Sequence, residues 1–171
     1  MSKKFIGEQF KNLEVEDITA LGKGVVKSKE GKVIFVSGVI PGDKISVETF
    51  KKRQGYFEGK LTDINEPSKD RITPECKHFG ICGGCKWQNM SYESQLLFKQ
   101  KQIINNLKNL SGMVLPEIEN IQPAPEPYFC RNKMEYTFSN KRWLTAEEIA
   151  DKPMNIEKKG LGFHKAGMWD K

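Results

Sequence analysis

Apolar and polar positions alternate in short runs between residues 10 and 66, and this pattern predicts five short β-strands. Glycine and proline turn signals, such as residues 41–43, separate the runs. So few strands bury their edges best by closing into a small barrel. The positions that mark the runs are Leu13, Val15 and Ile18; Val25 and Val26; residues 33–36; Ile45, Val47 and Thr49; and Leu61 and Ile64.

A helical period replaces the strand period between Ser91 and Leu110. Apolar residues recur there at spacings of three and four, which is the period of one helix face. Ser91 can cap the start of this helix, and Gly112 can end it. Four prolines between residues 116 and 127 then predict an extended connector.

Past the connector the pattern returns to strands. Met134, Tyr136 and Phe138 alternate as in a half-buried strand, and residues 160–164 resemble its partner strand. Residues 143–156 between them read as an insertion with a short helix at residues 145–150. The fold class expected from these elements is mainly β, of the α+β type.

Composition narrows the class of protein. With 171 residues, 37% hydrophobic and 29% charged, the chain has the make-up of a soluble globular protein with one domain or two small ones. No apolar window is long enough for a membrane helix, and residues 1–5 lead into no signal segment, so we expect no membrane partner and a cytoplasmic location. The net charge of +6 favours a polyanionic partner.

One basic cluster stands beside aromatic residues at a predicted strand–loop–strand junction. It consists of Lys51, Lys52 and Arg53, followed by Tyr56 and Phe57. Cations can hold phosphates there while a ring stacks on a base. A solvated hairpin tip with one aromatic packed inward is the alternative.

Three cysteines, Cys76, Cys82 and Cys85, follow at C-x5-C-x2-C spacing. Clustered thiols in a reducing compartment point to a metal or cofactor rather than to disulfides, and Gly83 and Gly84 let backbone amides point at sulfur. An iron–sulfur cluster is one interpretation. A structural zinc site of three cysteines and one histidine, with His78, is another.

These motifs resemble the bacterial 23S rRNA uracil-5-methyltransferases, and the match runs through nearly the whole chain. The residues that carry the resemblance are the cysteine motif, Trp87-Gln88, Tyr92, Gln95, Lys99, and residues 128–138 and 161–164. The resemblance implies an OB-like, RNA-binding TRAM barrel in residues 1–66, a linker and cysteine-cluster loop in 67–90, a helix in 91–112, and a truncated β central domain in 113–171.

By this resemblance, the complete protein transfers a methyl group from S-adenosylmethionine to carbon 5 of a uracil in RNA, with rRNA as the expected partner. The chain itself is expected to be an inactive N-terminal fragment without the catalytic domain. A stand-alone TRAM RNA-binding module with a structural zinc or iron–sulfur site is the alternative, and an electron carrier is a third class.

The resemblance also suggests particular residues and a particular cofactor. Cys76, Cys82 and Cys85 are expected to hold a 4Fe-4S cluster, whose fourth cysteine in the family comes after the residues that match 161–164. The chain ends before any such residue, so the cluster is expected to be lost or replaced by zinc. Cys130 stands in place of an aromatic residue and is expected to be buried.

Two further expectations concern surfaces. Arg131 and Lys133 are expected to contact RNA, together with the barrel residues Lys51, Lys52, Arg53 and Tyr56. The helix in residues 91–112 is expected to pack on the missing catalytic domain. Its apolar stripe could then be exposed and drive self-association.

Overall fold

The structure is a computed structural model that describes residues 6–112, 114–151 and 156–168. The chain divides into two compact units, Met1–Thr73 with Asn89–Pro123, and Pro74–Gln88 with Ala124–Lys171. Neither of the helices in the described part has the length and apolar character that crossing a bilayer requires. The first five residues, where we predicted no signal segment, lie outside the described residues.

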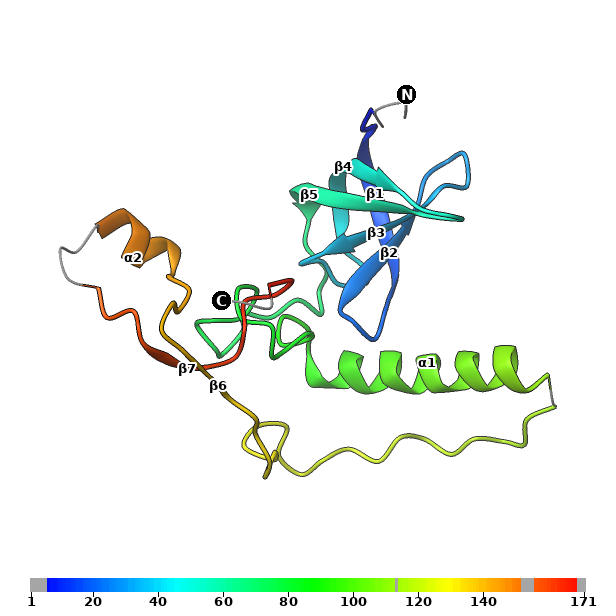
Figure 1. The fold of residues 1–171 in the computed structure, drawn as a ribbon. Helices are drawn as coiled ribbons and strands as arrows, with labels where there is room; N and C mark the ends of the chain where they lie inside the picture. The colour runs from blue at the N-terminus through cyan, green and yellow to red at the C-terminus, as the bar shows by residue number, and fades with distance from the viewer. Residues whose placement is uncertain (1–5, 113, 152–155, 169–171) are drawn as a thin grey trace. The chain divides into compact units, whose positions relative to one another are not determined.

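Five strands in the first unit form a closed barrel in the order β1-β2-β3-β5-β4 (Figure 1). This confirms the predicted five-stranded barrel. Strands β3 and β5 pair in parallel and every other neighbouring pair is antiparallel, with β1 and β4 closing the ring. The strands are β1 (Gln9–Ile18), β2 (Lys23–Lys27), β3 (Val33–Ser37), β4 (Lys44–Lys52) and β5 (Phe57–Glu66).

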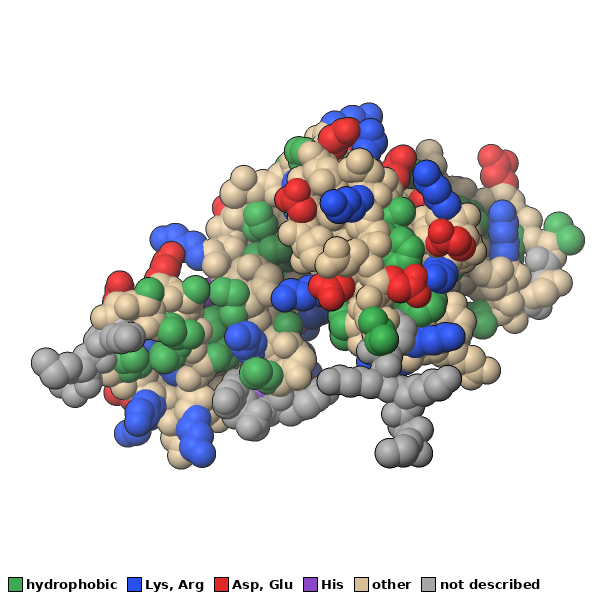
Figure 2. All heavy atoms as spheres, turned by 90° about the horizontal axis from the view of Figure 1, so that it is seen from above, with side chains coloured by type: hydrophobic (Ala, Val, Ile, Leu, Met, Phe, Trp, Pro, Cys, Tyr) green, Lys and Arg blue, Asp and Glu red, His purple; other side chains and the backbone are tan. Residues whose placement is uncertain are grey.

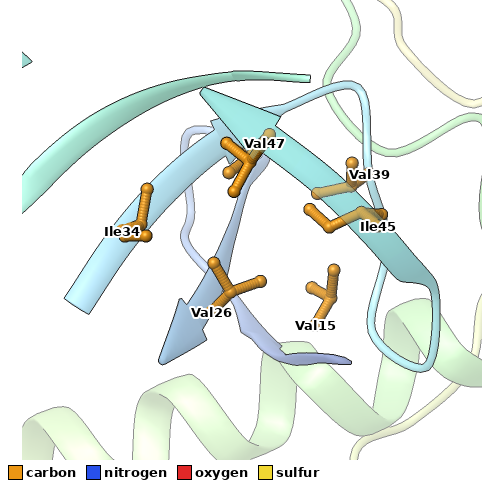
Figure 3. Packing of buried hydrophobic residues seen from close by; sticks show 7 residues of the cluster. Val15, Val26, Ile34, Val39, Ile45 and Val47 are labelled. Carbon is orange, nitrogen blue, oxygen red and sulfur yellow. The ribbon is translucent and has the colours of Figure 1, made fainter. Parts of the chain in front are cut away.

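The barrel interior is filled by aliphatic side chains from the alternating positions. Figure 3 shows Val15, Val26, Ile34, Val39, Ile45 and Val47 pointing into one shared interior, and each is at most 1% exposed. Burying a side chain of this size contributes about 1.5–3 kcal/mol. Gly59 packs within this core, because a Cβ there would lie 2.5 Å from Cγ2 of Val47.

A buried carboxylate ties the segment after β5 to the barrel. Asp43 is fully buried and accepts hydrogen bonds from the backbone amides of Ile40 (2.8 Å) and Ser68 (2.9 Å). The guanidinium of Arg71 pairs with the same carboxylate. The first part of the predicted linker is therefore held against the barrel.

The chain leaves the first unit after Thr73 and returns to it at Asn89. One antiparallel bridge, between Arg71 and Met90, joins the two ends of this excursion. Its two hydrogen bonds run from the amide of Ile72 to the carbonyl of Asn89 (3.1 Å) and from the amide of Ser91 to the carbonyl of Asp70 (2.8 Å). The start of the following helix is thereby fixed to the same unit as the barrel.

Helix α1 (Tyr92–Ser111) confirms the long helix predicted from the sequence. The hydroxyl of Ser91 accepts from the amide of Ser94 at 3.3 Å, and Gly112 ends the helix in the left-handed conformation with φ 62°. Lys101 pairs with Asp17 at 2.7 Å, which joins α1 to the end of β1. The extended chain that follows runs back along α1 (Figure 1), and the side chain of Gln100 bonds to residues 119 and 121.

The second unit contains a small strand pair and a short helix. The antiparallel pair of β6 (Thr137–Ser139) and β7 (Gly160–Gly162) confirms the predicted partnership of these two segments. Helix α2 (Ala146–Asp151) lies in the insertion, as the sequence predicted. It starts with a capping box, in which the amide of Thr145 donates to Glu148 (2.9 Å) and that of Glu148 donates to the Thr145 hydroxyl (3.2 Å).

One expectation about this unit is wrong. Met134, Tyr136 and Phe138 were expected to be half-buried, but they are 42%, 51% and 83% exposed. A two-stranded ribbon has no second layer of its own with which to bury a face. Of the three residues only Phe138 lies in β6, while Tyr136 precedes the strand and packs against the ring of Phe163, with centroids 5.1 Å apart.

Candidate functional site

The basic cluster lies at the end of β4 and the start of the turn that leads to β5. The amide of Arg53 donates to the carbonyl of Tyr56 at 2.8 Å, and Gly55 takes a φ of 86°, which a residue with a side chain rarely adopts. This tight turn leaves Lys51, Lys52 and Arg53 exposed at one end of the barrel. The three cations are therefore presented to solvent together.

Glu58 partly neutralises this end of the barrel. Nε of Arg53 donates to its carboxylate at 2.8 Å, and Nζ of Lys23 lies 3.7 Å away. The hydrogen bond from Arg53, with smaller contributions from Lys23 and Lys51, holds the pKa of Glu58 below its ordinary value. One carboxylate is shared by two cations, so a positive excess remains for an anionic ligand.

The two aromatic residues of the turn point in different ways. Phe57 is partly buried and packs against the core, so the alternative interpretation of an inward-packed ring holds for this residue. Tyr56 instead meets the ring of Phe35 edge-on, with centroids 4.9 Å apart. Because Phe35 lies between buried Ile34 and Val36 on β3, its ring is on the outer face of the barrel.

Two aromatic residues on this outer face, Phe35 and Phe50, were missed from the sequence. Together with Lys23 and Lys60 they line a hollow of about 520 Å³. The signal was present, since both rings occupy outward positions of predicted strands: Phe35 lies between inward Ile34 and Val36, and Phe50 follows inward Thr49. Elsewhere Lys and Arg side chains lie interspersed with Asp and Glu side chains, as Figure 2 shows for one face.

In the second unit, the three motif cysteines lie in one irregular loop as free thiols. Cys82 is half-buried, while Cys76 and Cys85 are exposed. The amide of Gly84 donates to Sγ of Cys82 at 3.3 Å, which is the kind of amide–sulfur bond expected from the glycine pair. Gln88 reaches both ends of the loop, because its Oε1 accepts from the amide of Cys76 and its Nε2 lies 3.3 Å from Sγ of Cys85.

A distant segment of the same unit braces this loop. The amide of Gly83 donates to the carbonyl of His164 at 2.9 Å, and the amide of Ala166 donates to the carbonyl of Ile81 at 3.0 Å. A Cβ on Gly83 would lie 3.0 Å from the oxygen of His164, which explains the small residue there. The residues that follow β7 therefore lie beside the cysteines in space.

The thiols supply suitable ligand chemistry for iron–sulfur or zinc, because thiolate sulfur is the soft donor that both prefer. In the described part of the chain, however, no three Cys, His, Asp or Glu side chains come together as a metal-holding group. The ring of His78 packs edge-on against Trp143 instead, with centroids 5.7 Å apart. The cysteines thus offer the donors without a preformed three-ligand arrangement.

The remaining candidates lie in the exposed chain before β6. Nε of Arg131 donates to the carbonyl of Lys133 at 2.9 Å, and Nζ of Lys133 pairs with Glu135 at 3.0 Å. Cys130 was expected to be buried, and that expectation is wrong, because it is exposed with its Sγ 3.9 Å from the carbonyl of Pro127. The segment has no regular structure that could bring this thiol into a core.

Comparison with known proteins gives a consistent set of relatives, although no protein-family model matches the chain. A protein of Bacteroides thetaiotaomicron named as an uncharacterized RNA methyltransferase is 41% identical over 154 residues, 90% of this chain and 34% of that protein. A protein of Cupriavidus pinatubonensis, named 23S rRNA (uracil(1939)-C(5))-methyltransferase RlmD, is 39% identical over 151 residues, 86% of this chain and 30% of that protein.

The closed five-stranded barrel has the OB-like architecture expected from the sequence. The relatives make this class more specific, because most of the chain is similar to a part of these RNA methyltransferases. This confirms the resemblance found in the motifs. The chain spans about a third of the length of the curated relatives that it matches.

Proposed function

We propose that the chain forms the RNA-holding part of an S-adenosylmethionine-dependent RNA uracil-C5 methyltransferase that acts on ribosomal RNA in the cytoplasm. The observation that carries the proposal is the 39% identity, over 86% of the chain, to a protein named as a 23S rRNA uracil-C5 methyltransferase. Chemistry on a base requires that base outside the stack, so such an enzyme needs surfaces that hold the flanking RNA.

The basic turn is the first such surface. Lys51, Lys52 and Arg53 are all exposed at this end of the barrel, and Tyr56 packs against Phe35. Cations at this density attract the phosphate backbone, while the ring offers a face to a base. Arg131 and Lys133 add two exposed cations in the second unit.

RNA binding by the turn is tested by fluorescence anisotropy with a labelled single-stranded RNA over a range of salt concentrations. Changing Lys51, Lys52 and Arg53 to Gln together should weaken binding and lower the salt slope by about 0.7 for each phosphate that the protein no longer neutralises. Lys27→Gln, on the same barrel, is the matched control. An unchanged salt slope in the triple variant would remove the turn from the proposal.

For the cysteines, we propose that Cys76, Cys82 and Cys85 hold an iron–sulfur cluster or, in its place, zinc. Such a group would supply rigidity to the loop in residues 76–85, because methyl transfer to a base consumes no electron. Iron, sulfide and zinc assays on anaerobically purified protein test this proposal. We expect a partial content of iron, or bound zinc. A full, air-stable 4Fe-4S complement would contradict the expectation that the cluster is lost or replaced.

The methyl-transfer step itself is assigned to the whole enzyme, since the chain covers only about a third of its relatives. The 171-residue chain, mixed with S-adenosylmethionine and rRNA, is expected to bind the RNA without methylating it. Methyl incorporation at carbon 5 of uracil by this chain alone would contradict that assignment.

The exposed stripe of α1 supports a proposal of self-association. Leu97, Ile103 and Leu110 are 63%, 54% and 86% exposed on this helix. Apolar side chains gathered on one element favour association through that surface. Light scattering over a range of concentrations tests this, and a monomer throughout would contradict it.

A further inference from the structure

The RNA contacts proposed for the basic turn leave one hollow on the outer surface of the barrel without an assigned ligand. Its volume is about 520 Å³, and side chains from β2, β3, β4 and β5 line it. This is within the range of about 300–1,000 Å³ that is typical of small-ligand sites. The residues that matter for its chemistry are Lys23, Phe35, Phe50, Glu58 and Lys60.

Two aromatic rings form part of its lining. Phe35 is half-buried on β3, where Tyr56 supports it edge-on. Phe50 is 57% exposed on β4, at a position where the pairing with β5 shifts register between Thr49 and Lys51. Aromatic rings that share one hollow offer stacking surfaces for a flat ring of a ligand.

The charge of the lining favours an anionic ligand. Lys23 and Lys60 both line the hollow, against a single carboxylate, that of Glu58. Arg53 already bonds to this carboxylate at 2.8 Å, so Glu58 does not cancel both lysines. Lys60 forms no ion pair with another residue of the described part of the chain.

We propose that this hollow binds one unpaired nucleobase of single-stranded RNA, stacked on Phe50 and Phe35, with the neighbouring phosphates on Lys23 and Lys60. The inference rests on the proposed function, because it takes RNA as the ligand, and it adds the form of RNA and the residues that recognise it. A base inside a duplex has both faces covered by its neighbours, so only an unstacked nucleotide can present a face to these rings.

The test uses a short oligouridine labelled with fluorescein, a labelled RNA duplex of the same length, and anisotropy at several salt concentrations. Phe50→Ala should weaken binding of the single strand by about tenfold and leave the salt slope unchanged, since stacking displaces no counterions. Phe50→Tyr should restore most of the affinity. Lys60→Gln should lower both the affinity and the salt slope, the slope by about 0.7.

Phe138→Ala, which removes an 83% exposed ring from the second unit, is the aromatic control and should bind the oligouridine as the original chain does. Circular dichroism melting establishes that Phe50→Ala keeps its fold. If the chain binds RNA but Phe50→Ala binds as tightly as the original, or if duplex and single strand bind equally, this inference is overturned while the proposed function stands. Absence of RNA binding at low salt would overturn both.

Discussion

The guanidinium of Arg71 pairs with the carboxylate of Asp43, which is 28 positions earlier in the chain and fully buried in the barrel. Two backbone amides, those of Ile40 and Ser68, donate to the same carboxylate. A buried charge needs this many partners, because burial removes its hydration. The pair therefore controls whether the segment after β5 stays docked.

Arg71→Ala is expected to destabilise the first unit, because it leaves the buried carboxylate of Asp43 without its counter-charge. Removing one partner of a buried pair costs about 3–5 kcal/mol, and the low end applies because the Arg71 side chain is 22% exposed. Urea unfolding followed by circular dichroism measures the change. Lys27→Gln, which breaks an exposed pair with Glu16, should leave the midpoint nearly unchanged.

Gly59→Ala tests the packing of the barrel core. The added Cβ would lie 2.5 Å from Cγ2 of Val47 and 2.8 Å from Cγ2 of Ile34, so the core must shift. Overpacking of this kind costs about 1–3 kcal/mol in thermal or urea unfolding. Gly162→Ala is the control, because nothing lies within 4 Å of its Cβ position. Equal midpoints for the two variants would contradict the close packing at Gly59.

Ser91→Ala should shorten α1 at its N-terminus. The Ser91 hydroxyl accepts from the amide of Ser94, and removing a cap of this type costs about 1 kcal/mol. Hydrogen exchange of the first-turn amides should rise in this variant. Ser46→Ala removes the hydroxyl of a half-buried residue in β4, which donates to Asn65 and does not contact α1's first turn, and should leave those exchange rates unchanged.

The capping carboxylate of α2 should titrate at an unusually acidic pH. The hydrogen bond from Arg142, together with the amide of Thr145, lowers the pKa of Glu148 to about 2. The folded-state pKa lies below the ordinary value. The ionised carboxylate therefore contributes its full stabilisation of this region at any pH above the ordinary pKa of a glutamate. That contribution is lost as the pH falls toward about 2. Carbon-13 NMR of the side-chain carboxyls measures the midpoint, and an ordinary value would contradict the paired geometry.

Local periodicity was enough to predict most of the fold. Alternation at Ile45 and Val47, and helical spacing after Ser91, predicted β4 and α1, because each pattern reports which side chains share one face. It does not report whether another element covers that face. Phe138 therefore matched a half-buried strand and is nevertheless exposed.

The candidate site was predictable only in part, for a related reason. The cations Lys51, Lys52 and Arg53 are adjacent in sequence, so a turn keeps them together. The hollow beside them depends on Phe35 and Phe50, which come together only because β5 pairs with both β3 and β4. No local pattern reports such a pairing.

The antiparallel contact between Arg71 and Met90 makes residues 74–88 an insert whose two ends are fastened together in the first unit. Because both ends of this insert are fastened, a change in its length leaves the register between the barrel and α1 unchanged, and doubling the length of a flexible loop costs only about 0.6 kcal/mol. The bridge thus makes the position of α1 on the barrel independent of the length of the cysteine loop.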